Sequence, residues 1–154
     1  MKGDIPLREK KAILLVDDNA EDETLIVRAL KDHIVVVTRD GSEALDYLFG
    51  TGMYQGRNPY DLPQAVILDL NMPQVDGFEV LTKLRADERT RLLPVVILTR
   101  SNEKQNVLRG YGLGANSYLR KPVDTAQFAE VVRHLGQYWL ELNEAPANRV
   151  ADSS

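Results

Sequence analysis

Five polar residues that could carry out chemistry together follow short apolar segments of the sequence. They are Asp17, Asp18, Asp69, Thr99 and Lys121. Three carboxylates brought close together repel one another unless a cation lies among them, and hard oxygen ligands of this kind suit Mg²⁺. A carboxylate beside Mg²⁺ can attack a phosphoryl group as a nucleophile and form an aspartyl phosphate. A lysine ammonium and a threonine hydroxyl would then hold the phosphoryl oxygens.

Each of these residues also has a plainer explanation when it is taken alone. An Asp–Asp pair after a strand is most often a helix N-cap. A lone Thr is usually a cap or turn residue, and a lone Lys is usually solvated. Their joint occurrence after successive strands favours a site, provided that those strands belong to one sheet.

The apolar segments have the composition of strands that are buried on both faces. Residues 12–16 (AILLV), 34–37 (IVVV), 65–68 (AVIL) and 95–98 (VVIL) are wholly apolar, and 115–119 (ANSYL) is a weaker candidate. Uninterrupted, β-branched-rich runs of this length are typical of a parallel sheet covered by helices.

Helical patterns lie between these segments. Apolar residues recur at helical spacing within residues 17–33, 42–49, 77–86 and 102–111, and again from about residue 125 onward. This alternation predicts right-handed βα units. We therefore expect an α/β fold with a five-stranded, doubly wound, flavodoxin-like parallel sheet in the order 2-1-3-4-5, with helices on both faces. The carboxyl ends of its strands would bring the polar residues to one edge.

The composition narrows the class of protein further. The chain has 154 residues, 44% of them hydrophobic, and no cysteine, which excludes disulfide scaffolds and thiol or cysteine–metal sites. A formal charge of −4 weighs against nucleic acid as the partner. No apolar run approaches the roughly 20 residues of a membrane span, so we expect a cytoplasmic protein that does not bind membranes. We expect an N-terminal extension over 1–10, one domain over 11–142 and a flexible tail over 143–154.

Four motifs resemble the receiver domain of two-component response regulators. They are VDD at 16–18, LDLNMPQVDGFEVL at 68–81, VVILT at 95–99 and YLRKP at 118–122, and the resemblance extends over residues 11–140. It implies a single-domain response regulator of a phosphorelay, to which a sensor histidine kinase donates a phosphoryl group. Phosphorylation would switch a protein–protein interaction surface, so the chain would be a phosphoacceptor switch rather than an enzyme with a separate substrate.

The resemblance also assigns roles to the acidic residues. By position, Asp69 is the phosphoacceptor. Asp18, Asp69 and the carbonyl of Asn71 would bind Mg²⁺, with Asp17 helping mainly through water.

The remaining family positions are a phosphoryl-binding pair and a switch. Thr99 and Lys121 would hold the phosphoryl group, and Thr99 together with Tyr118 would move when it arrives. The resemblance also implies a cis peptide bond between Lys121 and Pro122.

One position departs from the family pattern. The residue after the site threonine is usually small, and here it is Arg100, followed by Ser101. A guanidinium at this place could screen the acyl phosphate from water, pair with phosphate or a carboxylate, or point into solvent. We expect Arg100, with Ser101, to modulate access to the phosphoryl group and its lifetime.

The final helix is longer than a receiver sheet can cover. Its stripe includes Phe128, Tyr138, Trp139 and Leu142, which we expect to form a homodimer or partner surface with strand 5 and the preceding helix. Alternatively, Trp139 folds back onto its own domain.

The long loop over 50–64 is interpreted as a tolerated insertion. Together with the aromatic-rich end of the final helix, it resembles the corresponding parts of small regulators paired with bacterial phytochrome kinases.

Two other functions compete with the phosphorylated switch. A haloacid-dehalogenase-type phosphatase would also use an aspartyl nucleophile, Mg²⁺, a hydroxyl residue and a lysine. It would need an Asp-x-Asp pattern after the first strand, whereas Asp17-Asp18-Asn19 stands there. A phosphorylation-independent adaptor with the receiver fold is the other alternative, and the complete set of site residues argues against it.

Overall fold

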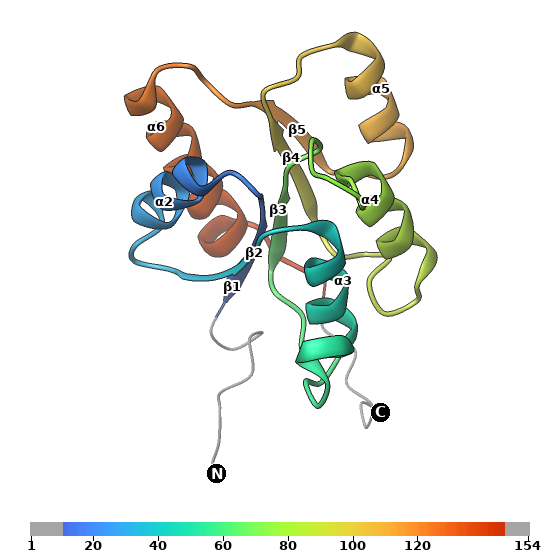
Figure 1. The fold of residues 1–154 in the computed structure, drawn as a ribbon. Helices are drawn as coiled ribbons and strands as arrows, with labels where there is room; N and C mark the ends of the chain where they lie inside the picture. Colours follow the sequence, from blue (N-terminus) through green and yellow to red (C-terminus); the bar gives the residue numbers. More distant parts are fainter. Residues whose placement is uncertain (1–10, 147–154) are drawn as a thin grey trace.

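The computed structural model describes residues 11–146 and contains one five-stranded sheet (Figure 1). All neighbouring strands are parallel, in the order β2-β1-β3-β4-β5, which confirms the predicted doubly wound α/β fold. The strands are β1 (Ala12–Val16), β2 (Ile34–Thr38), β3 (Ala65–Leu68), β4 (Val95–Thr99) and β5 (Ser117–Arg120). The fifth strand lies slightly further along the chain than predicted.

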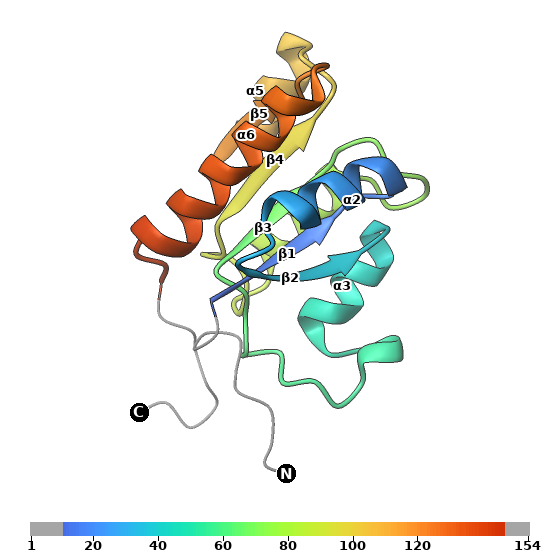
Figure 2. The same cartoon turned by 90° about the vertical axis from the view of Figure 1, so that its left-hand side faces the viewer.

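Helices cover both faces of this sheet, which is why the central strands β1 and β3 are wholly apolar. Figure 1 shows α2 and α6 on one face and α3, α4 and α5 on the other, and Figure 2 shows the sheet from the side of α2 and α6. The helices are α2 (Ala20–Ala29), α3 (Gly41–Phe49), α4 (Gly77–Ala86), α5 (Lys104–Gly112) and α6 (Thr125–Gly136). Side chains of successive β1 residues point to opposite faces of the sheet. Ile13 packs in the α2–α6 cluster, the hydrophobic core between the sheet and those two helices, and Leu14 packs in the core between the sheet and α3 and α4.

Local sequence determines where the helices that follow β1 and β3 begin. The Asn19 side chain caps α2 by accepting a hydrogen bond from the Asp22 N–H at 2.9 Å, and Asp76 caps α4 in the same way. Gly77, the first residue of α4, lies so close to the chain after β3 that a Cβ there would be 2.3 Å from the Asp69 carbonyl oxygen. The absence of a side chain at Gly77 therefore lets α4 hold the Asp69 loop in place.

The end of the last helix differs from the predicted continuous stripe. After α6 the chain forms a π-helical turn, η2 (Gln137–Leu142), in which residues per turn increase and the buried face shifts. Leu140 is consequently buried at 3% exposure, whereas Leu142 is 66% and Tyr138 48% exposed. Trp139 is partly buried against the α2–α6 cluster, so the alternative in which it folds back onto its own domain describes the structure better.

Phe128 was predicted at the dimer or partner surface, and this prediction is wrong. The side chain is only 2% exposed and packs in the hydrophobic core between its own helix, α6, and the sheet. The reason is its position early in α6, where the helix crosses the sheet and its apolar stripe is fully covered.

The long connection after α3 packs against that helix. It contains a short 3₁₀ helix, η1 (Gly52–Tyr54). The Arg57 guanidinium lies 3.9 Å from the centre of the Tyr47 ring and donates hydrogen bonds to the carbonyls of Tyr47 and Asp61.

Within residues 11–146, no helix has the length and apolarity to cross a membrane. Residues 1–10 and the tail from 147 onward lie outside the described part of the chain.

Candidate phosphoryl-transfer site

Four of the predicted residues meet at the carboxyl edge of the sheet. Asp17, Asp69, Thr99 and Lys121 follow or end β1, β3, β4 and β5, and all four are buried. The Lys121 Nζ lies 2.8 Å from an Asp17 oxygen and 3.1 Å from an Asp69 oxygen. Strands that are far apart in sequence thus deliver one ammonium and two carboxylates to the same point, as the parallel topology predicts.

Asp17, Asp18 and Asp69 form a cluster suited to a divalent cation. One carboxylate oxygen of each lies within 4.8 Å of the others. Backbone N–H groups orient two of them: Asn19 donates to Asp17 at 2.9 Å, and Leu70 donates to Asp69 at 2.7 Å. Asp18 is exposed and has no hydrogen bond or ion pair within residues 11–146, so its oxygens are open to a ligand. Hard oxygen donors in this number fit Mg²⁺ or Mn²⁺.

Burial and charge act together on the ionisable groups of the site. Burial raises the pKa of Asp17, and the hydrogen bonds from Lys121 and from the Asn19 backbone offset part of that rise. For Lys121, burial alone lowers the pKa, but hydrogen bonds to Asp17 and Asp22 and the charge of Asp69 raise it above its ordinary value. Lys121 therefore remains an ammonium and is the internal countercharge of the cluster.

The hydroxyl of Thr99 is buried without a hydrogen-bond partner. Thr99 is 0% exposed, and its Oγ1 contacts no donor or acceptor among the described residues. Its backbone carbonyl accepts a hydrogen bond from the Lys121 N–H at 2.7 Å, which joins the two strand ends. An unpaired buried hydroxyl costs about 1–3 kcal/mol, so this group is available for an incoming acceptor such as a phosphoryl oxygen.

Tyr118 connects the last strand with the loop after Thr99. Its hydroxyl donates to the Ser101 carbonyl at 2.8 Å, and its ring lies beside Gly110 of α5. The role of Tyr118 as a switch, and that of Ser101 in access, remain predictions. Asn71 is exposed in the loop after Asp69, and its carbonyl as a metal ligand also remains a prediction.

Sequence reasoning missed a fourth carboxylate at this site, Asp22. Its Oδ2 lies 2.8 Å from the Lys121 Nζ, and it forms an ion pair with Arg100 at 3.0 Å. Arg100 therefore pairs with a carboxylate, one of the three outcomes considered for it. Asp22 resembled an ordinary first-turn acidic residue that favours the helix dipole. No pattern in the sequence distinguishes it from its neighbours Glu21 and Glu23, which are acidic residues of the same first turn.

The predicted cis peptide bond between Lys121 and Pro122 is wrong for this structure. The residues it describes contain no cis peptide bond. An X–Pro sequence permits both isomers and favours the trans form by about 0.5–1 kcal/mol, so the sequence alone does not require cis.

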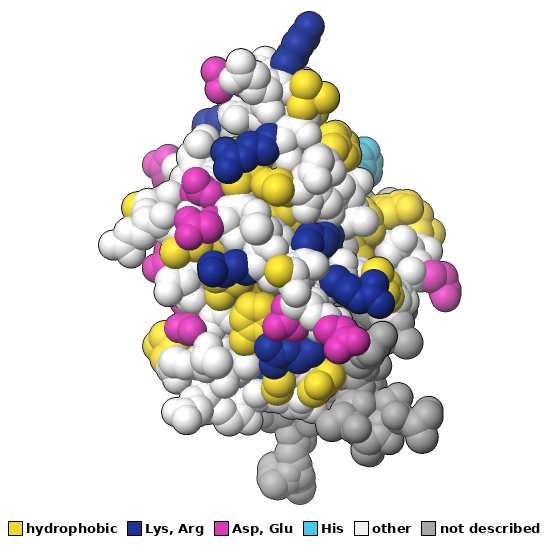
Figure 3. Space-filling model, turned by 90° about the vertical axis from the view of Figure 1, so that its right-hand side faces the viewer, with side chains coloured by type: hydrophobic (Ala, Val, Ile, Leu, Met, Phe, Trp, Pro, Cys, Tyr) yellow, Lys and Arg dark blue, Asp and Glu magenta, His cyan; other side chains and the backbone are white. Residues whose placement is uncertain are grey.

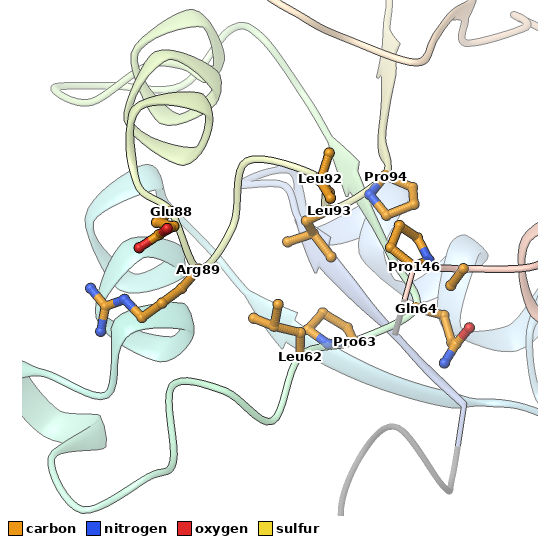
Figure 4. Close-up of a pocket in the computed structure, with 10 residues that line it drawn as sticks. Leu62, Pro63, Gln64, Glu88, Arg89, Leu92, Leu93, Pro94 and Pro146 are labelled. Carbon is orange, nitrogen blue, oxygen red and sulfur yellow. The ribbon is translucent and has the colours of Figure 1, made fainter. Parts of the chain in front are cut away.

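A small cavity lies at the opposite end of the sheet and does not belong to this site. It has a volume of about 30 Å³ and is lined by residues that include Leu62, Leu93, Pro94 and Pro146 (Figure 4). These residues precede β3 and β4 or follow η2, whereas Asp69 follows β3. The length of the strands therefore separates the cavity from Asp69. The space is on the scale of single water molecules, and none of the predicted site residues lines it.

Comparisons with known proteins identify the family of this chain. A family model described as the response regulator receiver domain matches residues 13–133. The probable methanogenesis regulatory protein FilR2 of Methanothrix harundinacea is 40% identical over 138 residues, covering 87% of this chain and 86% of that protein. Response regulator Rcp1 of Synechocystis sp. is 35% identical over 141 residues, covering 89% and 94%.

Solved structures give the same result. The phosphorylated cyanobacterial phytochrome response regulator RcpA superposes with a TM-score of 0.83 at 35% identity, covering 89% of this chain and 99% of that one. The Mn²⁺-bound form of Rcp1 superposes with a TM-score of 0.82, also at 35% identity and with the same coverage. The chain belongs to the response regulator receiver family and is a two-component response regulator that works as a phosphorylation-dependent switch.

Proposed function

We propose that Asp69 is the phosphoacceptor and that a sensor histidine kinase supplies the phosphoryl group. An Asp69 carboxylate oxygen attacks phosphorus while the bond from phosphorus to the donor histidine nitrogen breaks, and that nitrogen keeps the electron pair. The product is an acyl phosphate on Asp69. The observation that carries this proposal is the orphan Thr99 hydroxyl at the end of β4, next to the strands that bring Lys121 and Asp69 together.

The chain supplies positioning and charge to this transfer. Lys121 exchanges its hydrogen bond to Asp69 for one to a phosphoryl oxygen, and the Thr99 hydroxyl donates to another. The metal that we propose is Mg²⁺, which would be held by Asp18, Asp69 and the Asn71 carbonyl, with Asp17 acting mainly through water. When bound, it neutralises charge on the phosphoryl oxygens. A cation in a relative supports this site, since Rcp1 has been solved in a Mn²⁺-bound form.

The test is phosphorylation of the wild-type protein and of Asp69→Asn by acetyl phosphate. With Mg²⁺, the intact mass of wild type should increase by one phosphoryl group, and neither Asp69→Asn nor wild type with a chelator should change. An unmodified wild type would support the phosphorylation-independent adaptor. Rapid turnover of many phosphate esters would support a phosphatase.

We further propose that the kinase is a bacteriophytochrome. The names of related structures support this, because RcpA is described as a phytochrome response regulator and shares 35% identity with this chain. Phosphotransfer profiling against a panel of histidine kinases that includes a phytochrome kinase tests the proposal. Transfer from other kinases at equal or higher rates would contradict it.

We also propose that the protein forms a homodimer through η2, β5 and α5. Tyr138 and Leu142 of η2 and Leu108 and Tyr111 of α5 are exposed apolar side chains, a composition typical of interfaces. On the side of the sheet that bears α4 and α5, hydrophobic side chains lie among side chains of both charges (Figure 3). Sedimentation at micromolar concentration should show a dimer in wild type and a monomer in Leu142→Glu. Trp139 is unsuitable for this test because its side chain is partly buried against the α2–α6 cluster of its own domain.

A further inference from the structure

Both carboxylate oxygens of Asp22 accept hydrogen bonds from cationic side chains, those of Lys121 and Arg100, at the edge of the phosphoryl site. Its Oδ2 accepts hydrogen bonds from the Lys121 Nζ at 2.8 Å and the Arg100 Nη1 at 3.2 Å, and its Oδ1 accepts one from the Arg100 Nη2 at 3.0 Å. Asp22 is 5% exposed, whereas the Arg100 side chain is 58% exposed. A carboxylate is rarely buried without compensation, and here two cations compensate it.

The backbone of α2 directs Asp22 towards Lys121. Asn19 caps the helix and fixes the Asp22 N–H, so the first turn has a defined orientation. Glu21, the preceding acidic residue, is exposed on the same turn. The difference between the two carboxylates is therefore one of direction, and only Asp22 reaches the site.

Asp22 completes the coordination of the Lys121 ammonium. An ammonium has three N–H donors, and here their acceptors are oxygens of Asp17, Asp22 and Asp69 at 2.8, 2.8 and 3.1 Å. When Lys121 transfers one hydrogen bond from Asp69 to a phosphoryl oxygen, the bonds to Asp17 and Asp22 can remain. Asp17 also belongs to the cation cluster, whereas Asp22 lies outside it and can remain bound to Lys121 whether or not a metal is present.

Arg100 cancels the charge that Asp22 brings. Asp17, Asp18, Asp69 and Lys121 together have a formal charge of −2, which matches one divalent cation. Asp22 and Arg100 add one negative and one positive charge, so the cluster is still at −2 with the pair included. The pair thus holds Lys121 without altering the attraction of the site for a divalent cation.

We propose that Asp22 is a positioning residue that keeps Lys121 directed at the phosphoryl group, and that Arg100 is its charge partner. This inference rests on the proposed role of Asp69. It makes two separable predictions, because the position of Lys121 determines the rate of phosphorylation and the net charge determines the affinity for Mg²⁺.

The experiment compares Asp22→Asn, Arg100→Ala and the double variant with wild type, with Glu21→Gln as the control for loss of an acidic group from the same helical turn. By calorimetry without a phosphodonor, Mg²⁺ should bind about tenfold more weakly to Asp22→Asn and several-fold more tightly to Arg100→Ala. The double variant should bind Mg²⁺ like wild type, since the two charge changes cancel. Glu21→Gln should bind like wild type because its side chain faces solvent.

The rate with acetyl phosphate at saturating Mg²⁺ should follow a different pattern. It should fall by about 10- to 100-fold in Asp22→Asn and in the double variant, because Lys121 is released in both, and by less in Arg100→Ala. In the metal-free protein, the nitrogen NMR signal of the Lys121 ammonium should be observable in wild type and broadened by faster proton exchange in Asp22→Asn.

Each part of the inference has its own contrary result. Unchanged rate, Mg²⁺ affinity and Lys121 signal in a folded Asp22→Asn would overturn it, even if the variant were less stable. If Asp22→Asn does not fold, Arg100→Ala decides, and unaltered Mg²⁺ affinity there would overturn the charge argument. A wild type that is not phosphorylated would instead contradict the proposed role of Asp69, while the Mg²⁺ and NMR measurements would still test how Asp22 holds Lys121.

Discussion

Lys121→Met should destabilise the metal-free protein substantially. The substitution removes the ammonium while keeping an unbranched side chain, and it leaves Asp17, Asp22 and Asp69 without their shared partner. Each hydrogen bond to a charged group contributes about 1.5–3 kcal/mol, but the three contributions are not additive because Lys121 also loses its hydration on burial. Breaking a buried ion pair by removing one partner costs about 3–5 kcal/mol. We expect the free energy of unfolding at neutral pH in the presence of a chelator to fall by that amount.

Mg²⁺ should reduce this difference. A divalent cation that binds only the folded state stabilises it in proportion to the logarithm of its concentration relative to its Kd. The carboxylates freed from Lys121 should bind the cation more tightly, so the variant should gain more stability from Mg²⁺ than wild type gains. Urea denaturation with chelator and with millimolar Mg²⁺ measures both quantities.

The matched control is Lys83→Met, which removes an exposed ammonium from α4. It should change the free energy of unfolding by less than about 0.5 kcal/mol and leave the effect of Mg²⁺ unaltered. The reasoning is refuted if metal-free Lys121→Met lies within about 0.5 kcal/mol of wild type, or if Mg²⁺ stabilises the two proteins equally.

Three further predictions concern single contacts. Thr99→Val should raise metal-free stability by up to about 1 kcal/mol, because it removes an unpaired buried hydroxyl, yet slow phosphorylation by acetyl phosphate; lower stability in urea would contradict this account. Gly77→Ala should lower stability by about 1–3 kcal/mol, because its Cβ would overlap the Asp69 carbonyl, and unchanged stability would show that α4 can move away. Tyr54 donates to Glu43 at 2.7 Å, which raises the pKa of Tyr54 to about 12. The folded state therefore keeps the phenol proton more tightly than the unfolded state, and the advantage of wild type over Tyr54→Phe is full below pH 10 and lost as the pH rises towards 12; a difference that stays constant over this range would argue against the hydrogen bond.

Short-range patterns in the sequence were sufficient to predict the sheet and most of the residues that meet at the site. Strands that are apolar throughout must be buried on both faces, which requires a layer of helices on each side of the sheet. The alternation of these strands with helical patterns is compatible with only a few sheet topologies. Once the strands are parallel and ordered 2-1-3-4-5, their carboxyl ends must meet, and Asp17, Asp69, Thr99 and Lys121 come together. The family motifs added residue roles that spacing alone could not supply.

The features that required the tertiary structure depend on side-chain direction and on local helix geometry. Asp22 and Glu21 are equivalent as first-turn acidic residues, and only packing against Lys121 distinguishes them. The π-helical turn exchanges Leu142 for Leu140 in the core, which an α-helical stripe cannot anticipate because its period is different.

The sequence by itself therefore determined the α/β class, the strand order and the residues at the strand ends, since these follow from hydrophobic pattern and chain connectivity. The tertiary structure decided which charges contact Lys121, that Arg100 pairs with Asp22, that Phe128 is buried and that the bond before Pro122 is trans. Those outcomes depend on contacts between elements that are distant in the chain and on small free-energy differences between alternative local conformations, and neither is encoded in residue spacing.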